Sequence, residues 1–438
     1  MNERGHGDTE APADCVIFTE VPLEEEERLG LEREHIMVED AGSLEVAVDG
    51  DRRLRSFFET FSEVALFSED ALSNFSTFRL LSGYLERHKE MKIEEDILCF
   101  LRCEDPLMER VIMEYHERVR DHVPMELLLF DISSMAAREL FDKESIYGNI
   151  LSSLEHCCDT AALDASLFSY IPEPHVLIAG FGPYGKALLH QVLLMGDLTP
   201  CSEVRGYERL RITVVDKKRD EILTYINDRY PAIDRICELD VIGADIRSHE
   251  AEERLDTHPV PTYVIIDIPD MNYGIEALYR LEAYLGLRIL EDGDPWGRDT
   301  LREADSWIIP TAILMDEEQD RLRSLIDKGG QSHIKIVPFG GRSDILKRKY
   351  MIEPKIEKAA MDFNRDYQLM QRIISGEKRR EEESTDALIL WKKLDHEKRS
   401  SNRAQAACRP YIRSLLGLLP KLPQKESILA TGSNTELV

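Results

Sequence analysis

Positive charge is scarce in this sequence: 55 lysines and arginines stand against 84 aspartates and glutamates, and the formal net charge is −29. Binding to nucleic acid requires a basic surface, because much of the affinity comes from neutralised phosphates. The same acidic balance disfavours an anionic membrane surface. The composition therefore argues against nucleic acid as a partner and against attachment to an anionic membrane.

Long apolar segments are missing as well. No run reaches the roughly 18 apolar residues that a membrane helix needs, and the best candidate, residues 66–85, is interrupted by Glu69, Asp70 and Arg79. The first residues do not resemble a signal peptide. The eight cysteines are scattered without zinc-ligand spacing, which fits reduced thiols in the cytosol. We therefore expect a cytoplasmic protein without membrane insertion and without a metal site.

Motifs of catalysis are lacking too. The sequence contains no nucleophile elbow, no P-loop, no HExxH motif and no Ser/Lys or Cys/His pair at a useful spacing. Its 438 residues and 43% hydrophobic content nevertheless allow two or three domains with substantial cores. We expect a globular protein without evident catalytic residues, in which ligand binding is more plausible than turnover.

The segment from His175 to Asp216 carries the strongest local signal. An apolar run at 176–179 is followed by a glycine turn, by a helical pattern from Ala187, and by a β-branched run at 212–215 that ends on Asp216. The glycines stand at GxGxxG spacing and are Gly180, Gly182 and Gly185. This order of strand, turn, helix, strand and acid is typical of a dinucleotide-binding unit.

Each part of the pattern has a physical role in nucleotide binding. The first glycine permits a tight turn, the second lets a phosphate approach the backbone, and the third lets the helix pack on the strand. The helix N-terminus offers N–H groups to a diphosphate, and Asp216 can accept hydrogen bonds from ribose hydroxyls. Asp216 lies further on than the usual ~20 residues, which an inserted loop at 196–209 explains. The alternative is that the glycines serve only the turn of a parallel-sheet core.

Further patterns extend this unit into a doubly wound α/β sheet. Strand-like runs near 236–241, 262–267, 306–314 and 334–340 alternate with helical segments. We expect strand order 3-2-1-4-5-6, with a ligand outside the carboxyl ends of the first and fourth strands and Asp240, at the end of the third strand, near an adenine. The residues predicted at this ligand are Gly180, Phe181, Gly182, Pro183, Tyr184, Gly185, Asp216, Lys217, Asp240 and Asp267.

The rest of the chain divides by composition and pattern. We expect a helical segment up to about Phe67, a second helix, and then a β-α-β unit with strands at 97–101 and 125–130. Pro172 and Pro174 indicate a boundary near residue 170. The predicted domains are a flexible acidic arm at 1–50, a helical and small α/β domain at 51–170, a Rossmann domain at 171–350, a small all-α domain at 351–419 and a disordered tail at 420–438.

The all-α domain offers a second candidate site. A helix is predicted to open at Asn402 with Ser400 or Ser401 as its cap, and arginines follow on its turns, which suits an anion. Aromatic side chains could stack on a base. The alternative is that Trp391 is the core of a small helical domain and that the arginines are solvated. The candidate residues are Tyr367, Trp391, Ser401, Asn402, Arg403, Arg409 and Arg413.

Two resemblances follow from these residues. Residues 171–340 resemble the nucleotide-binding domain of bacterial potassium-transport regulators, the TrkA-N or RCK family, and residues 351–418 resemble the bacterial form of the ryanodine-receptor (RyR) repeat domain. The first rests on Gly180, Gly182, Gly185, Asp216 and Asp240. The second rests on Tyr367, Trp391, Leu394, the SNRAQA run at 401–406, Arg413 and Gly417. The segment that begins at Cys103 is similar to the region before the glycine motif in bacterial proteins that combine both domains.

The resemblance implies regulation rather than turnover. TrkA-N domains bind NAD(H), ATP or ADP and transmit occupancy as a conformational change, and for the RyR domain a second nucleotide-type ligand or a partner is implied. We therefore expect a homodimeric nucleotide sensor in ion-transport regulation or signalling, whose partner is a membrane channel or an effector protein. The alternatives are an anti-phage or stress effector that senses an ADP-ribose-type messenger, and an NAD-dependent oxidoreductase with Tyr273 or Asp267 as proton donor.

Overall fold

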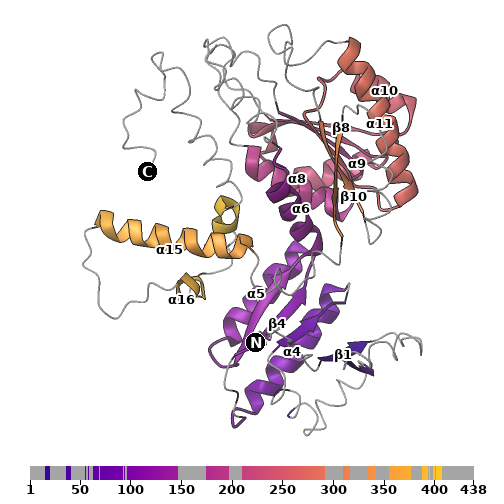
Figure 1. The fold of residues 1–438 in the computed structure, drawn as a ribbon. Coiled ribbons are helices and arrows are strands. Elements are labelled where there is room, and N and C mark those ends of the chain that lie inside the picture. The colour runs from indigo at the N-terminus through magenta and orange to yellow at the C-terminus, as the bar shows by residue number, and fades with distance from the viewer. Residues whose placement is uncertain are drawn as a thin grey trace, which may run out of the picture. The chain divides into compact units, whose positions relative to one another are not determined.

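The chain forms two compact units, Met1–Asp131 and Ile132–Val438, in a computed structural model (Figure 1). The structure describes the backbone of 15–19 and 36–40, Arg55, Phe58, most of 63–146, and residues 174–196, 210–291, 309–315, 334–341, 355–375 and most of 387–406. The boundary falls before α6 (Ile132–Lys143), well ahead of the predicted residue 170, because this helix lies against α8 and β11 of the second unit.

The first unit is built on a three-stranded parallel sheet with order β3-β4-β5. Its elements are β3 (Glu63–Leu66), α4 (Ala71–Arg87), β4 (Ile97–Arg102), α5 (Pro106–Val119) and β5 (Met125–Phe130). An aspartate caps each helix: Asp70 accepts from the first turn of α4 and Asp105 from that of α5. The predicted β-α-β unit and second helix are confirmed, and Cys99 and Cys103 are buried in this core.

One prediction for this unit is wrong, and one pair of strands was not predicted. Glu63–Leu66 is a strand rather than part of a helix, because Val64 pairs in parallel with Cys99 of β4, and a run of four residues is too short to reveal its period. Within the segment predicted to be a flexible arm, β1 (Cys15–Thr19) pairs in parallel with β2 (Ile36–Asp40). The predicted helical segment at 23–34 lies outside the described residues.

The second unit contains a six-stranded parallel sheet with the order β11-β10-β9-β6-β7-β8. Counted from β6, this is the predicted order 3-2-1-4-5-6, and the fold is a Rossmann-like α/β fold. Its strands are β6 (His175–Ala179), β7 (Leu210–Val215), β8 (Cys237–Ile242), β9 (Tyr263–Ile266), β10 (Ile309–Leu314) and β11 (Ile334–Phe339). The helices between them are α8 (Pro183–Gly196), α9 (Arg219–Arg229), α10 (His249–Leu255) and α11 (Met271–Glu291).

Helices cover both faces of this sheet, which explains why its central strands are buried and mostly apolar. Every residue of β6 and β9 is buried. One face, with Leu177 and Val264, forms a core with α10 and α11. On the opposite face, Phe141 of α6 packs against Tyr263 with 5.9 Å between ring centroids. The two helical layers leave the carboxyl ends of the strands as the edge where functional side chains can gather.

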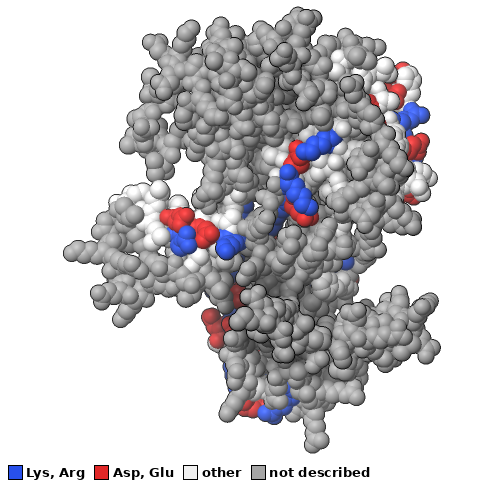
Figure 2. Space-filling model, in the orientation of Figure 1, with Lys and Arg blue, Asp and Glu red and all other residues white. Residues whose placement is uncertain are grey.

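The C-terminal part contains α15 (Lys355–Ser375) and α16 (Ala387–Lys392), whose small core comprises Ala360, Trp391 and Ala406. On the face drawn in Figure 2, acidic and basic side chains of the described residues lie next to one another. On α15, Arg365 pairs with Asp362. None of the helices that the structure describes has the length and apolar content to cross a bilayer.

Candidate functional site

The glycine turn joins β6 to α8 at the carboxyl edge of the large sheet. Gly180 has a φ of 93°, a backbone conformation that suits glycine, and its N–H donates to the carbonyl of Val215 at 2.9 Å. Pro183 begins α8, where the missing N–H costs no helical hydrogen bond. The turn therefore forms where the sequence predicts it, but Pro183 removes one N–H group that a ligand could have used.

A carboxylate of the chain itself binds two of the N–H groups of this turn. Asp267 directly follows β9, and its Oδ2 accepts hydrogen bonds from the N–H groups of Gly182 at 2.8 Å and Gly185 at 2.7 Å. The residue is only 2% exposed, and its Oδ1 has no hydrogen-bond partner among the residues that the structure describes. Burial raises the pKa of Asp267 to about 6, although the two N–H donors act in the opposite direction.

All three glycines of the motif make room for Asp267. A Cβ at Gly180 would overlap the carbonyl oxygen of Asp267. A Cβ would lie 3.1 Å from Asp267 Oδ2 if added at Gly182, and 2.8 Å from it if added at Gly185. The backbone of Asp267 therefore requires glycine at position 180, and its side chain lies close to where a Cβ would stand at Gly182 and Gly185, which favours the alternative that the glycines serve the turn itself.

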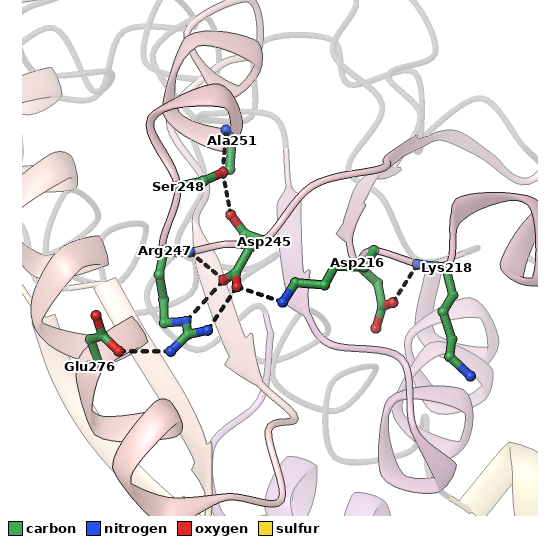
Figure 3. Close-up of polar contacts among 8 residues, drawn as sticks. Asp216, Lys218, Asp245, Arg247, Ser248, Ala251 and Glu276 are labelled. Atoms are coloured by element: carbon green, nitrogen blue, oxygen red, sulfur yellow. Dashed lines mark hydrogen bonds and ion pairs between the residues drawn. The ribbon is translucent and has the colours of Figure 1, made fainter.

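Asp216 lies at the tip of β7, as predicted, and is tied to the same turn. Its Oδ2 accepts from the N–H of Phe181 at 3.0 Å. Its Oδ1 accepts from the N–H of Lys218 at 2.8 Å (Figure 3). Each carboxylate oxygen can accept a second hydrogen bond. The geometry is therefore compatible with a ribose hydroxyl at Asp216.

An ionic cluster that the sequence did not reveal lies beyond β8. Asp245 bonds to Lys217 Nζ at 2.9 Å and to Arg247, whose Nη2 lies 2.8 Å away, and Arg247 also reaches Glu276 of α11 at 2.7 Å (Figure 3). The Arg247 guanidinium also lies 4.3 Å from the ring centroid of Tyr273. Hydrogen bonds from Arg247, and then from Lys217, hold the pKa of Asp245 well below its usual range. Lys217, predicted at the ligand, is thus paired in this cluster.

Asp240 does not end its strand. It lies two residues inside β8, where its Oδ1 accepts from the N–H of Val241 and its Oδ2 lies 3.1 Å from His258 Nε2. The prediction of a strand-end acid here is wrong, because the strand continues to Ile242.

A cavity of about 630 Å³ lies beside this part of β8, and residues of both charge signs line it, among them Lys217, Arg219, Asp240, Gly243, Arg254 and His258.

These observations decide what the site can hold. The turn does not fit a diphosphate in this arrangement, because the N–H groups of Gly182 and Gly185 are bonded to Asp267, whose carboxylate would repel phosphate when ionised. The cavity beside β8 falls within the roughly 300–1,000 Å³ of small-molecule sites. The tip of β7 and this cavity therefore suit a polar ligand better than the turn does.

The aromatic residues of the second candidate site differ in burial. Trp391 is 4% exposed in the small helical core, with the guanidinium carbons of Arg399 and Arg403 at 5.9 and 5.7 Å from its ring centroid, whereas Tyr367 on α15 is 53% exposed. This burial favours the alternative in which Trp391 is core.

The predicted helix start at Asn402 is wrong. Lys398 and Arg399 are already helical, and the Asn402 side chain donates to the Lys398 carbonyl at 2.9 Å. Ser401 and Arg403 therefore lie inside a helix and not at its opening turn. Arg409 and Arg413 lie outside the described residues.

Trp391→Ala is expected to lower the free energy of unfolding of the C-terminal helices by about 3 kcal/mol, because it leaves a large cavity in a small core. Hydrogen exchange of α15 amides measures this local loss. The control Tyr367→Ala should stay within ~0.5 kcal/mol of wild type, because that side chain is half exposed. Unchanged exchange in Trp391→Ala would contradict a core role.

Each of the two proton donors considered for an oxidoreductase contacts another part of the chain. The ring of Tyr273 lies against Arg247, and Asp267 is bonded to the glycine turn.

Comparison of the sequence with models of known protein families and with curated proteins found no match.

Proposed function

We propose that this protein is a regulatory nucleotide-binding protein that binds NAD or an adenine nucleotide at the carboxyl edge of the large sheet. The observation that carries the proposal is the hydrogen bond from the Phe181 N–H to Asp216, which joins the glycine turn to the tip of the neighbouring strand. The ribose lies at Asp216, and the adenine end lies toward the cavity beside β8.

The charged side chains at this edge favour regulation over turnover, because they are already paired with other groups of the chain. Asp267, Asp245, Lys217 and Arg247 all have hydrogen-bonding or ionic partners within the chain. When a ligand binds, these side chains can leave their partners in the chain and contact the ligand. This exchange of contacts can shift the protein toward a different conformation. In this proposal the C-terminal helical domain receives a second nucleotide-type ligand or a partner such as a channel or effector, and the protein acts as a homodimer.

Titration calorimetry with NAD, NADH, NADP, ATP, ADP and ADP-ribose tests the proposal. At least one of these ligands should bind with a Kd below about 100 µM. NAD should bind at least about ten-fold more tightly than NADP, because the 2′-phosphate of NADP would meet the Asp216 carboxylate.

Asp216→Asn is the informative variant, because its remaining oxygen can still accept hydrogen bonds while the charge is lost. This variant should reduce the preference for NAD, whereas Asp240→Asn, which alters an acid inside β8, should preserve it. The proposal fails if none of the ligands binds the wild-type protein. Tight binding of ADP-ribose alone would favour the second-messenger effector.

A further inference from the structure

The glycine turn has the chemistry of an oxyanion site. Two N–H groups, from Gly182 and Gly185, converge on one oxygen at 2.8 and 2.7 Å, which are the short distances of hydrogen bonds to a charged acceptor. The first turn of α8 adds the partial positive charge of a helix N-terminus. A phosphate oxygen would make the same contacts that Asp267 Oδ2 makes.

Asp267 differs from an ordinary helix cap. Asp70 and Asp105 are exposed and cap helices that begin at the next residue. Asp267 instead reaches the turn from another strand, 82 and 85 residues away along the chain, and it is almost fully buried. A local cap forms with its helix, whereas Asp267 is held in place by the packing of β9 against β6.

The second oxygen of Asp267 shows that the occupancy is imperfect. Its Oδ1 is buried, and no described residue donates a hydrogen bond to it, so this oxygen has lost its hydrogen bonds to water without a replacement from the described part of the chain. The nearby Asp216 adds a like charge. The raised pKa of Asp267 reflects the same unfavourable burial of charge. Asp267 therefore accepts the hydrogen bonds of the two N–H groups but buries a second oxygen at a cost. A phosphate could accept the same hydrogen bonds and has further oxygens for other donors.

We propose that the glycine turn is an anion site that carries its own anion: Asp267 occupies the place of a ligand phosphate, and an external phosphate binds these N–H groups only when Asp267 is removed or displaced. The bound class is a phosphate or diphosphate, either free or as part of a larger ligand. Only the identification of that larger ligand as a nucleotide rests on the proposed function.

Removal of the internal carboxylate tests this inference with inorganic anions. Asp267→Ala should leave the two N–H groups without an acceptor, so that phosphate or pyrophosphate stabilises the variant. At 100 times Kd, its Tm should rise by about 5 °C. The wild-type protein should show no comparable shift. Sodium chloride at equal ionic strength controls for screening.

Asp105→Ala is the matched control, because it also frees two helix N-terminal N–H groups, those of Leu107 and Met108, but at an exposed site that water can reach. Phosphate should not selectively stabilise it. Equal shifts in both variants, or no shift in Asp267→Ala, would overturn the proposal.

Asp267→Asn covers the case in which the alanine variant fails to fold. It keeps an oxygen acceptor and loses the charge, so pyrophosphate should bind it at least about ten-fold more tightly than wild type. Equal weak binding would overturn the internal-anion role. Because these readouts use inorganic anions, they are independent of nucleotide binding by the wild-type protein. A positive anion result with no nucleotide binding would overturn only the proposed function.

Discussion

Gly180→Ala is expected to lower the free energy of unfolding of the second unit by more than about 4 kcal/mol, or to prevent its folding. Alanine is strained at a φ of 93°, and its Cβ would overlap the backbone carbonyl oxygen of Asp267. That oxygen belongs to the chain just after β9 and cannot rotate away as a side chain could. Urea denaturation followed by circular dichroism measures the loss.

Gly274→Ala is the matched control within the same unit. Gly274 lies in α11, and the nearest atom to an added Cβ, the Ile268 carbonyl oxygen, is 3.6 Å away. Alanine there should be neutral or should stabilise by up to about 1 kcal/mol, because it lowers the entropy of the unfolded chain. A loss of similar size in both variants would show that the approach of Asp267 is not what requires Gly180.

Much of the fold follows from the sequence because its strands are short apolar runs that alternate with longer helical patterns. The run at 176–179 and the run at 212–215 could be placed next to each other without any knowledge of long-range contacts. The strand β3 could not be predicted in this way. Glu63–Leu66 is too short to show a strand period, and the apolar residues before it have a helical spacing. The strands β1 and β2 were missed for a related reason. Each has only five residues within an acidic segment, and each forms a strand because it pairs with the other.

The candidate site could be predicted only where a single continuous segment of the sequence forms it. The glycine turn and the position of Asp216 follow from the βαβ pattern, and Asp267 was predicted beside the ligand at the same edge of the sheet. That Asp267 would bond to the turn could not be read from the sequence, because a carboxylate there can face a ligand or the turn, and packing decides which. Asp245 and Arg247 lie in an unpatterned link after β8, so only the folded structure brings them to Lys217 and Glu276.

His175 is expected to make the second unit sensitive to acid. It opens β6 and is 1% exposed, with Nδ1 at 2.8 Å from the Pro259 carbonyl oxygen and Nε2 at 2.9 Å from Thr213 Oγ1. Burial lowers the pKa of His175 to about 3, and the charges of Arg211 and His258 act in the same direction. The folded protein therefore excludes a proton that the unfolded chain binds below a pKa of about 6.5.

The sign of the effect follows from this difference. Stability from neutral His175 is fully present above pH 6.5 and is lost as the pH falls, by about 2 kcal/mol at pH 5. Asp267 acts in the opposite sense: its pKa is about 6 in the folded protein against 3.8 ordinarily, so its contribution to stability decreases as the pH rises between these values. The two effects partly cancel in the wild-type protein, which would conceal both in a single pH profile.

Variants at the two positions separate these contributions. His175→Asn should be less stable than wild type at pH 7, because it loses buried contacts, but this deficit should shrink by about 2 kcal/mol at pH 5. Asp267→Asn should show the reverse trend, with a steeper loss of stability than wild type as the pH falls from 6 to 4. Urea titrations at pH 4, 5, 6 and 7 measure both slopes. Parallel curves for His175→Asn and wild type would mean that His175 has the same pKa in the folded and the unfolded protein, and the buried contacts to Pro259 and Thr213 would then require a different arrangement.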